Sequence, residues 1–161
     1  MLSTSLSLLP AGIINGFMFG AIYALVALGL TLIYGVLHII NFAHGAMLML
    51  ALYSAYFLFK ILNIDPYVAI LIVTPASFIF GYVIYRWGIG KLSGGKDQNI
   101  LLITLGLSII LENAALFFFT GDQQTISLSY SYDSLDLGFL YLSYPKLISF
   151  IASLVICGLL W

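Results

Sequence analysis

Long apolar stretches separated by short polar segments run along the whole chain. No Lys, Arg, Asp or Glu occurs between Met1 and Phe59, and most later charges fall between apolar stretches. A helix of about 20 predominantly apolar residues can cross the hydrocarbon core of a bilayer. The pattern predicts about five spans, with the last one cut off at Trp161, over the ranges 8–34, 45–60, 67–85, 99–119 and 147–161.

The segments between these spans carry turn and loop residues. Asn63, Asp65 and Pro66 predict a tight turn, with Pro66 at the first position of the next helix. The range 86–97 combines several glycines with three cations and reads as a flexible polar loop. Because cytoplasmic loops are enriched in Lys and Arg, this loop is predicted to be cytoplasmic. That orientation places the loop 120–146, and the N-terminus, outside.

The external loop contains a pattern of period two. Apolar and aromatic residues alternate with serines over 126–132, as expected of a half-buried strand. Asp133 and Ser134 are suited to a turn, and 137–142 to a returning strand. We therefore expect a small external β-hairpin.

Composition supports a membrane location and excludes several classes of function. The 161 residues are 63% hydrophobic and 7% charged, whereas soluble domains carry about 25% charged residues. The predicted fold class is an all-α, polytopic bundle of transmembrane helices, a single domain over 1–161, in the inner or plasma membrane. No basic patch suggests nucleic acid, and the single cysteine excludes an intrachain disulfide. Catalytic motifs and metal-ligand clusters are missing from the sequence, so we expect neither enzymatic activity nor a metal site.

Small residues four apart mark one face of the first predicted span. They are Gly12, Gly16, Gly20 and Ala24. Residues at this spacing lie on one side of a helix, and small side chains let a second helix approach closely in a membrane. We predict a helix-packing face here.

Polar residues interrupt the apolar pattern between the first two spans. Asn41 is suited to cap a new helix starting near Phe42, with His44 in its first turn and Gly45 following. Non-helical backbone at membrane depth survives only when buried in protein or facing a water-filled cavity. The break is therefore either an interfacial turn or a discontinuity beside a substrate path.

A polar stripe runs along the fourth predicted span, where Thr104, Ser108 and Glu112 are four residues apart. A charge at mid-bilayer costs about 2.5–3.5 kcal/mol on insertion scales. Glu112 should therefore face the bundle or a wet cavity. The stripe either lies near a translocation path or provides hydrogen bonds between helices.

The residues Asn15 to Tyr53 read NGFMFGAIYALVALGLTLIYGVLHIINFAHGAMLMLALY. This segment closely resembles the start of permease subunits of branched-chain amino acid ABC importers of the LivH/LivM type. Further matches are ITLGLSIILENAALFFFTGD, from Ile103, and the segment from Leu137 to Trp161. The resemblance implies that the chain lies in the lipid bilayer and acts together with several partners. These are a second permease subunit, two cytoplasmic ATPases and an external substrate-binding protein. It also implies that ATP is used by the ATPases and that the chain needs no cofactor of its own.

By the same resemblance, the segment from Asn41 to Gly45 is a candidate for shaping the substrate path. Members of the family are nearly twice as long, so the chain resembles an N-terminal half and is not expected to couple to ATP alone. Two alternatives stay open: half of an ion-coupled secondary transporter or channel that uses Glu112, and a non-transporting, truncated remnant.

Overall fold

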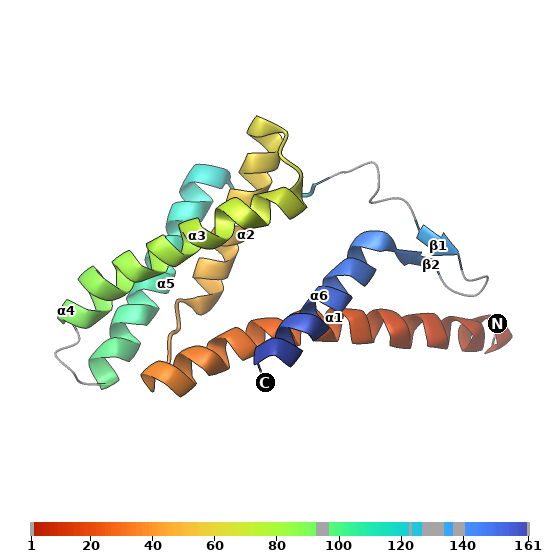
Figure 1. The fold of residues 1–161 in the computed structure, drawn as a ribbon, viewed down its shortest axis with the longest axis horizontal. Coiled ribbons are helices and arrows are strands. Elements are labelled where there is room, and N and C mark those ends of the chain that lie inside the picture. The colour runs from red at the N-terminus through yellow and green to blue at the C-terminus, as the bar shows by residue number, and fades with distance from the viewer. Residues whose placement is uncertain (1, 93–96, 123, 127–133, 137–140, 161) are drawn as a thin grey trace. The chain divides into compact units, whose positions relative to one another are not determined.

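The computed structural model describes residues 2–92, 97–122, 124–126, 134–136 and 141–160. Helices make up most of these residues (Figure 1). In chain order the elements are α1 (Leu2–Leu37), α2 (His44–Leu62), α3 (Pro66–Val83), the π-helix η1 (Ile84–Ile89), α4 (Gly90–Leu92), α5 (Asp97–Phe119), β1 (Ser134–Asp136), β2 (Tyr141–Ser143) and α6 (Tyr144–Leu160).

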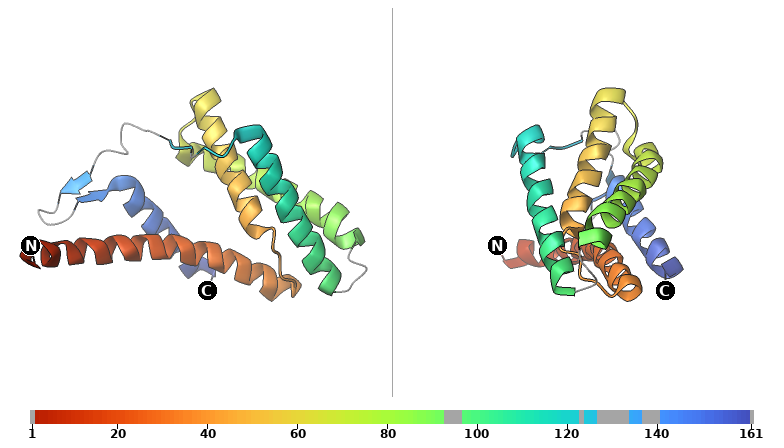
Figure 2. Two further views of the ribbon diagram at one scale, coloured as in Figure 1. Left: turned by 180° about the vertical axis from the view of Figure 1, so that it is seen from behind. Right: turned by 90° about the vertical axis from the view of Figure 1, so that its left-hand side faces the viewer.

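The chain divides into two compact units. The central unit comprises Ile33–Ile126, and the terminal unit comprises Met1–Leu32 together with Ser127–Trp161. In the central unit α2 packs against both α3 and α5, and η1 contacts α3 and α5 (Figure 2).

The turn between α2 and α3 forms as its residues predict. Asn63 adopts a left-handed conformation with φ 54°. The amides of Asn63 and Ile64 donate to the carbonyls of Phe59 and Leu58 at 3.0 and 3.3 Å, which closes the end of α2. Asp65 then caps α3 by accepting a hydrogen bond from the Tyr67 amide at 2.9 Å, and Pro66 is the first helical residue. The predicted tight turn is confirmed.

The predicted polar loop from Arg86 is wrong over residues 86–92, which are helical. The backbone continues beyond α3 as η1 and α4. A π-turn adds one residue per turn without breaking the hydrogen-bonded ladder. It thereby carries Gly88 and Gly90 within the helix. The glycines and cations in this range favour a loop locally, but here they lie at the end of a longer helix; residues 93–96 lie outside the described residues.

In the terminal unit, α1 and α6 meet through a small apolar cluster. Met18 is buried, and Ile14, Leu147 and Phe150 pack against it. The Lys146 ammonium, near the start of α6, lies 3.5 Å from Asn15 Oδ1. The same ammonium lies 5.2 Å from the centre of the Phe19 ring. These contacts use the side of α1 that carries Ile14 and Met18.

The terminal unit also contains a two-stranded antiparallel pair. Ser134 pairs with Ser143, and Asp136 pairs with Tyr141. The hairpin as predicted is not supported: Ser134, expected in the turn, lies in β1, and Ile126 is not in a strand. The rest of the predicted first strand, 127–133, lies outside the described residues. An alternating pattern shows which segments can form strands, whereas the pairing register decides which of them do.

Hydroxyl groups within the apolar helices bond to carbonyls of their own helix. The hydroxyls of Thr31, Ser54 and Ser149 each donate to the carbonyl four residues earlier, at 2.8–2.9 Å. Such back-bonding satisfies a polar side chain where no water is present. Polar residues in the helices are therefore compatible with a membrane.

Among the residues that the structure describes, four helical segments are long and apolar enough to span a bilayer. They are Gly12–Leu37, His44–Leu62, Pro66–Ile89 and Gln98–Phe119, while the apolar helix Tyr144–Leu160 is shorter. The class predicted from the sequence, a polytopic helical bundle, is confirmed at this level. The single-domain organisation, the exact spans and the side on which each loop lies stay predictions.

Candidate functional site

A six-residue interruption separates α1 from α2, and we call it the 38–43 segment. Helix α1 ends at Leu37, and His38 follows with φ 54°, a left-handed conformation uncommon for a residue other than glycine. The His38 amide still donates to the Tyr34 carbonyl at 2.8 Å. The chain then stays non-helical until α2 begins at His44. The predicted break is therefore present.

Asn41 organises the end of this segment, although not as the predicted cap. Its Oδ1 accepts a hydrogen bond from the Ala43 amide at 3.0 Å. Its carbonyl accepts from the His44 amide at 3.3 Å. Because α2 starts at His44, the capping position falls on Ala43, two residues after Asn41, and Ala43 makes no side-chain capping bond. The expectation of an Asn41 cap on a helix starting near Phe42 is thus corrected to a side-chain turn that precedes the helix.

The 38–43 segment is attached to α5 by one hydrogen bond. The Phe42 amide donates to Thr104 Oγ1 at 3.3 Å, across 62 positions of the chain. The Thr104 hydroxyl in turn donates to the Leu101 carbonyl at 3.1 Å, and the Thr104 side chain has 0% exposure. The structure therefore brings together two groups of residues that the sequence presents as separate, the helix break and the polar stripe.

The other two residues of the polar stripe bond to each other. Ser108 is buried, and its hydroxyl donates to Glu112 Oε1 at 2.8 Å. Glu112 itself is exposed in this chain and lies one helical turn beyond the buried face that holds Thr104 and Ser108. The Glu112 side chain therefore has a hydrogen-bond donor, Ser108, on one side and is exposed on the other. This position is compatible with a place near a translocation path and with hydrogen bonding between helices.

The remaining candidate residues fall in different surroundings. Phe42 exposes 53% of its surface, and a side-chain carbon added at Gly45 would meet no atom within 4 Å. His44 is half-buried at the first position of α2. The predicted packing residues Gly12, Gly16, Gly20 and Ala24 belong to the terminal unit. The role of each of these residues in a path or interface stays a prediction.

Small buried side chains of the central unit were not singled out from the sequence. Ala43, Ala46 and Ala115 are all buried, and small side chains let helix backbones approach closely. Alanine is so common in membrane helices that its sequence pattern alone carries little information. Only the structure shows that these three alanines are buried.

Further toward the end of α2, aromatic rings join α2 to α5. Phe119 stacks on Tyr53 with ring centroids 4.7 Å apart, and lies 4.8 Å from the Phe57 ring. The spacing of Tyr53 and Phe57, four residues apart, is a signal that could have indicated a shared face. These contacts and the Thr104 bond attach α2 to α5 at two separate levels.

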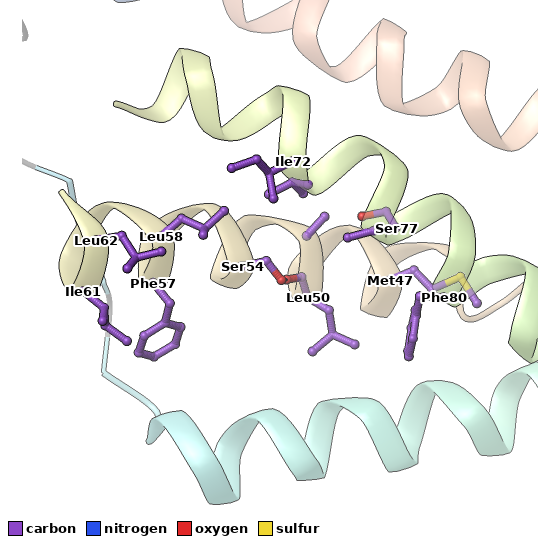
Figure 3. A pocket seen from close by; sticks show the side chains of 13 residues that line it. Met47, Leu50, Ser54, Phe57, Leu58, Ile61, Leu62, Ile72, Ser77 and Phe80 are labelled. Atoms are coloured by element: carbon purple, nitrogen blue, oxygen red, sulfur yellow. The ribbon is translucent and has the colours of Figure 1, made fainter. Parts of the chain in front are cut away.

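An apolar groove of about 670 Å³ lies between α2 and α3 (Figure 3). Its walls are almost entirely hydrocarbon, and two serine hydroxyls are the polar groups among its labelled lining residues; these include Met47, Leu58, Ile72, Phe80, Ser54 and Ser77. A groove of this chemistry accommodates apolar groups rather than ions.

Within the described ranges no group of three or more His, Cys, Asp or Glu side chains is arranged to hold a metal ion. At the break the central unit offers backbone amides, the buried Asn41 amide, the Thr104 hydroxyl and the imidazoles of His38 and His44. Amides and hydroxyls orient a polar solute or hold backbone in place.

Comparison with known proteins identifies the class of this bundle. Residues 12–161 match the family described as "Branched-chain amino acid transport system / permease component". The chain belongs to this family, which is a family of transport permeases and not of enzymes. It is accordingly a multi-pass protein of the cell membrane.

Individual relatives carry names of the same kind. The chain is 36% identical over 115 residues to the high-affinity branched-chain amino acid transport system permease protein BraD of Pseudomonas aeruginosa, covering 65% of this chain and 36% of BraD. It is 32% identical over 107 residues to the LivH permease proteins of Salmonella typhimurium and Escherichia coli K12, covering 62% of this chain and 35% of each LivH. The match thus spans about a third of the length of these relatives. No solved structure gives a significant match to the chain.

Proposed function

We propose that the chain is part of a permease subunit of an ABC importer that carries branched-chain or related amino acids across the cell membrane. The observation that carries this proposal is the family match over residues 12–161. The names of BraD and LivH agree with the substrate class.

The geometry of the central unit supports a transport role in a specific way. Irregular backbone at membrane depth is tolerated where it lines a cavity or is buried in protein, and transporter substrate sites commonly use such broken helices. The 38–43 segment is irregular backbone of this kind, with Asn41 buried and Phe42 exposed. Asn41, Phe42, His44, Gly45 and the α5 stripe are our candidates for residues along the path.

The proposed partners follow from the class of transporter, an ABC importer. A second permease subunit, identical or related, would complete the path. Two cytoplasmic ATPases would hydrolyse ATP, and an external binding protein would deliver the amino acid. This chain offers no nucleotide-binding motif, so the proposal assigns it no cofactor and no enzymatic step of its own.

Uptake measurements test the proposal. The gene encoding the chain is expressed with its neighbouring genes in cells that lack their own branched-chain amino acid uptake. Uptake of labelled leucine is expected, and it should be abolished by inactivating the ATPase subunits. Leucine uptake that is unaffected by ATPase inactivation, or the absence of any ATPase in the purified assembly, would contradict the proposal.

A second candidate, an ion-coupled carrier, rests on one specific observation, the Ser108–Glu112 hydrogen bond on an apolar helix. Glu112→Gln separates the two functions. The amide keeps an acceptor for Ser108 but cannot ionise, so the uptake that an ATP-driven importer retains in this variant should still depend on ATP and should not respond to an ionophore. Loss of uptake in Glu112→Gln, together with sensitivity to an ionophore and insensitivity to ATP depletion, would favour the ion-coupled carrier. Glu112→Asp serves as the matched control that keeps the charge.

A further inference from the structure

We infer that Thr104 is a positioning residue, which holds the 38–43 segment at a fixed depth against α5. The inference rests on the proposed function for its consequence in transport. The positioning itself is a property of the chain and is measured separately.

The Thr104 hydroxyl forms hydrogen bonds to two backbone groups. Its hydroxyl accepts from the Phe42 amide at 3.3 Å and donates to the Leu101 carbonyl at 3.1 Å. A hydroxyl offers one donor, and that donor is used. With 0% exposure already reached within this chain, additional subunits cannot expose the side chain in this arrangement. Thr104 therefore acts on the path through Phe42 rather than by touching a solute.

We place the attachment within the membrane layer, about two turns beyond the start of α5. Thr104 is seven residues after Asp97, the start of α5, which corresponds to about 10 Å along the helix axis. Only residues 93–96 separate that start from α4, and both η1 and α4 contact α5. Trp87 on η1 is 70% exposed and lies under the Lys91 ammonium at 5.0 Å, and exposed Trp and Lys side chains are typical of the bilayer interface.

At that depth an unpaired amide is costly, because water and alternative partners are scarce. Two amides of the segment are held by side chains: Ala43 by Asn41 and Phe42 by Thr104. Asn41 is close in sequence and can follow the segment if it moves. Thr104 lies on another helix, so its bond is the one that fixes the segment relative to α5.

Thiol labelling tests the positioning. Cys157 is the only cysteine of the chain, so Cys157→Ala gives a background without thiols. Ile40 is 47% exposed within the segment, and Ile40→Cys reports its access to a membrane-impermeant maleimide in inverted and right-side-out vesicles. Thr104→Val keeps the shape and removes the hydroxyl. It should raise the labelling rate about five- to tenfold, the factor expected for one lost hydrogen bond.

Two controls make the result specific. Thr104→Ser keeps the hydroxyl and should label within about twofold of the parent, because its acceptor for the Phe42 amide is retained. Ile61→Cys at the end of α2, at a position 73% exposed beside the turn to α3, should label equally in all backgrounds. Unchanged Ile40→Cys labelling in Thr104→Val would overturn the inference, as would an equal rise in Thr104→Ser. A matching rise at Ile61→Cys would indicate general loosening and would overturn it as well.

Transport by the complete assembly gives a second readout. Thr104→Val should lower the maximal rate of ATP-dependent uptake about fivefold or more while KM changes less than about twofold, because a displaced segment affects turnover rather than delivery of substrate. A change confined to KM would contradict a positioning role. If the labelling result holds and no assembly shows ATP-dependent uptake, the proposed function fails while the positioning of the segment stands.

Discussion

The small residues of the two units differ in their surroundings. In the central unit the buried residues are mostly small or polar, including Ala43, Ala46, Thr104 and Ser108. In the described part of the terminal unit, Met18 on α1 and Ser153 on α6 are buried, and Met18 packs against partly buried neighbours from α1 and α6. The glycines of α1 lie apart from these contacts: within 4 Å of a side-chain carbon added at Gly12, Gly16 or Gly20 there is no described atom.

The difference lies in whether small residues have found a partner. In a membrane, helices associate by close packing and hydrogen bonds, since lipid tails compete equally for apolar side chains. In the central unit α2 packs against α5 within the chain, and alanines and hydroxyl side chains are buried. On α1, Ile14 and Met18 contact α6, and a step of two residues from Gly12 or Gly16 turns about 200° around the helix. The glycine face therefore points away from α6 and is available to another helix.

The largest effect on the chain's own stability is expected for Ala46→Leu. Ala46 is 3% exposed at the start of α2, so extra methylenes must displace neighbouring side chains or the backbone. Overpacking of this kind typically lowers the free energy of unfolding by about 1–3 kcal/mol. The measurement is the unfolding of the purified chain in detergent micelles with increasing SDS. Ala152→Leu, the same change at an exposed position of α6, is the control. Equal stability of the two variants would show that the surroundings of Ala46 are not closely packed.

A smaller effect is expected for Asn41→Ala. The change removes the acceptor of the Ala43 amide and should lower the free energy of unfolding by about 1–2 kcal/mol, as for other lost side-chain-to-amide bonds near helix starts. Hydrogen exchange of the Ala43 amide should accelerate by about tenfold. Asn41→Ser retains an acceptor oxygen without adding a charge and is the matched control. If Asn41→Ala and Asn41→Ser exchange at the same rate, the side-chain turn does not hold the segment.

The smallest effect on the chain itself is expected for Gly16→Leu, made in the terminal unit. No described atom lies near an added side chain, and leucine has a higher helix propensity than glycine by up to about 1 kcal/mol. Unfolding in SDS should therefore be unchanged or slightly harder. Association with the second permease subunit, measured by co-purification, should fall severalfold because the close approach of a helix is blocked. Destabilisation of the isolated chain together with intact association would show that the glycine face packs within the chain.

Local patterns were enough to predict many features of the fold. The apolar runs predicted the helices, and Asn63, Asp65 and Pro66 predicted the turn between α2 and α3, because caps and turns depend on neighbouring residues. The loop at 86–92 and the hairpin were predicted less well. Both depend on longer-range structure: continuation of a helix through η1 in the first case, and strand register in the second.

The candidate site shows the same division. His38, Asn41 and His44 drew attention to the break because polar residues are rare between such apolar runs. The stripe on α5 was visible from its spacing of four. The bond between the two was not predictable, since a backbone amide at Phe42 has no sequence signature and its acceptor is 62 positions away.

The sequence by itself determined that this is a membrane protein of apolar helices, where its helices break, and which permease family it resembles. These properties depend on composition, on local hydrogen bonding and on inherited motifs. Only the tertiary structure decided that Thr104 bonds to Phe42, that three alanines of the central unit are buried, and that α6 packs on Ile14 and Met18 of α1. Those outcomes depend on which helix faces meet, and many pairings of similar apolar faces would satisfy the same local pattern.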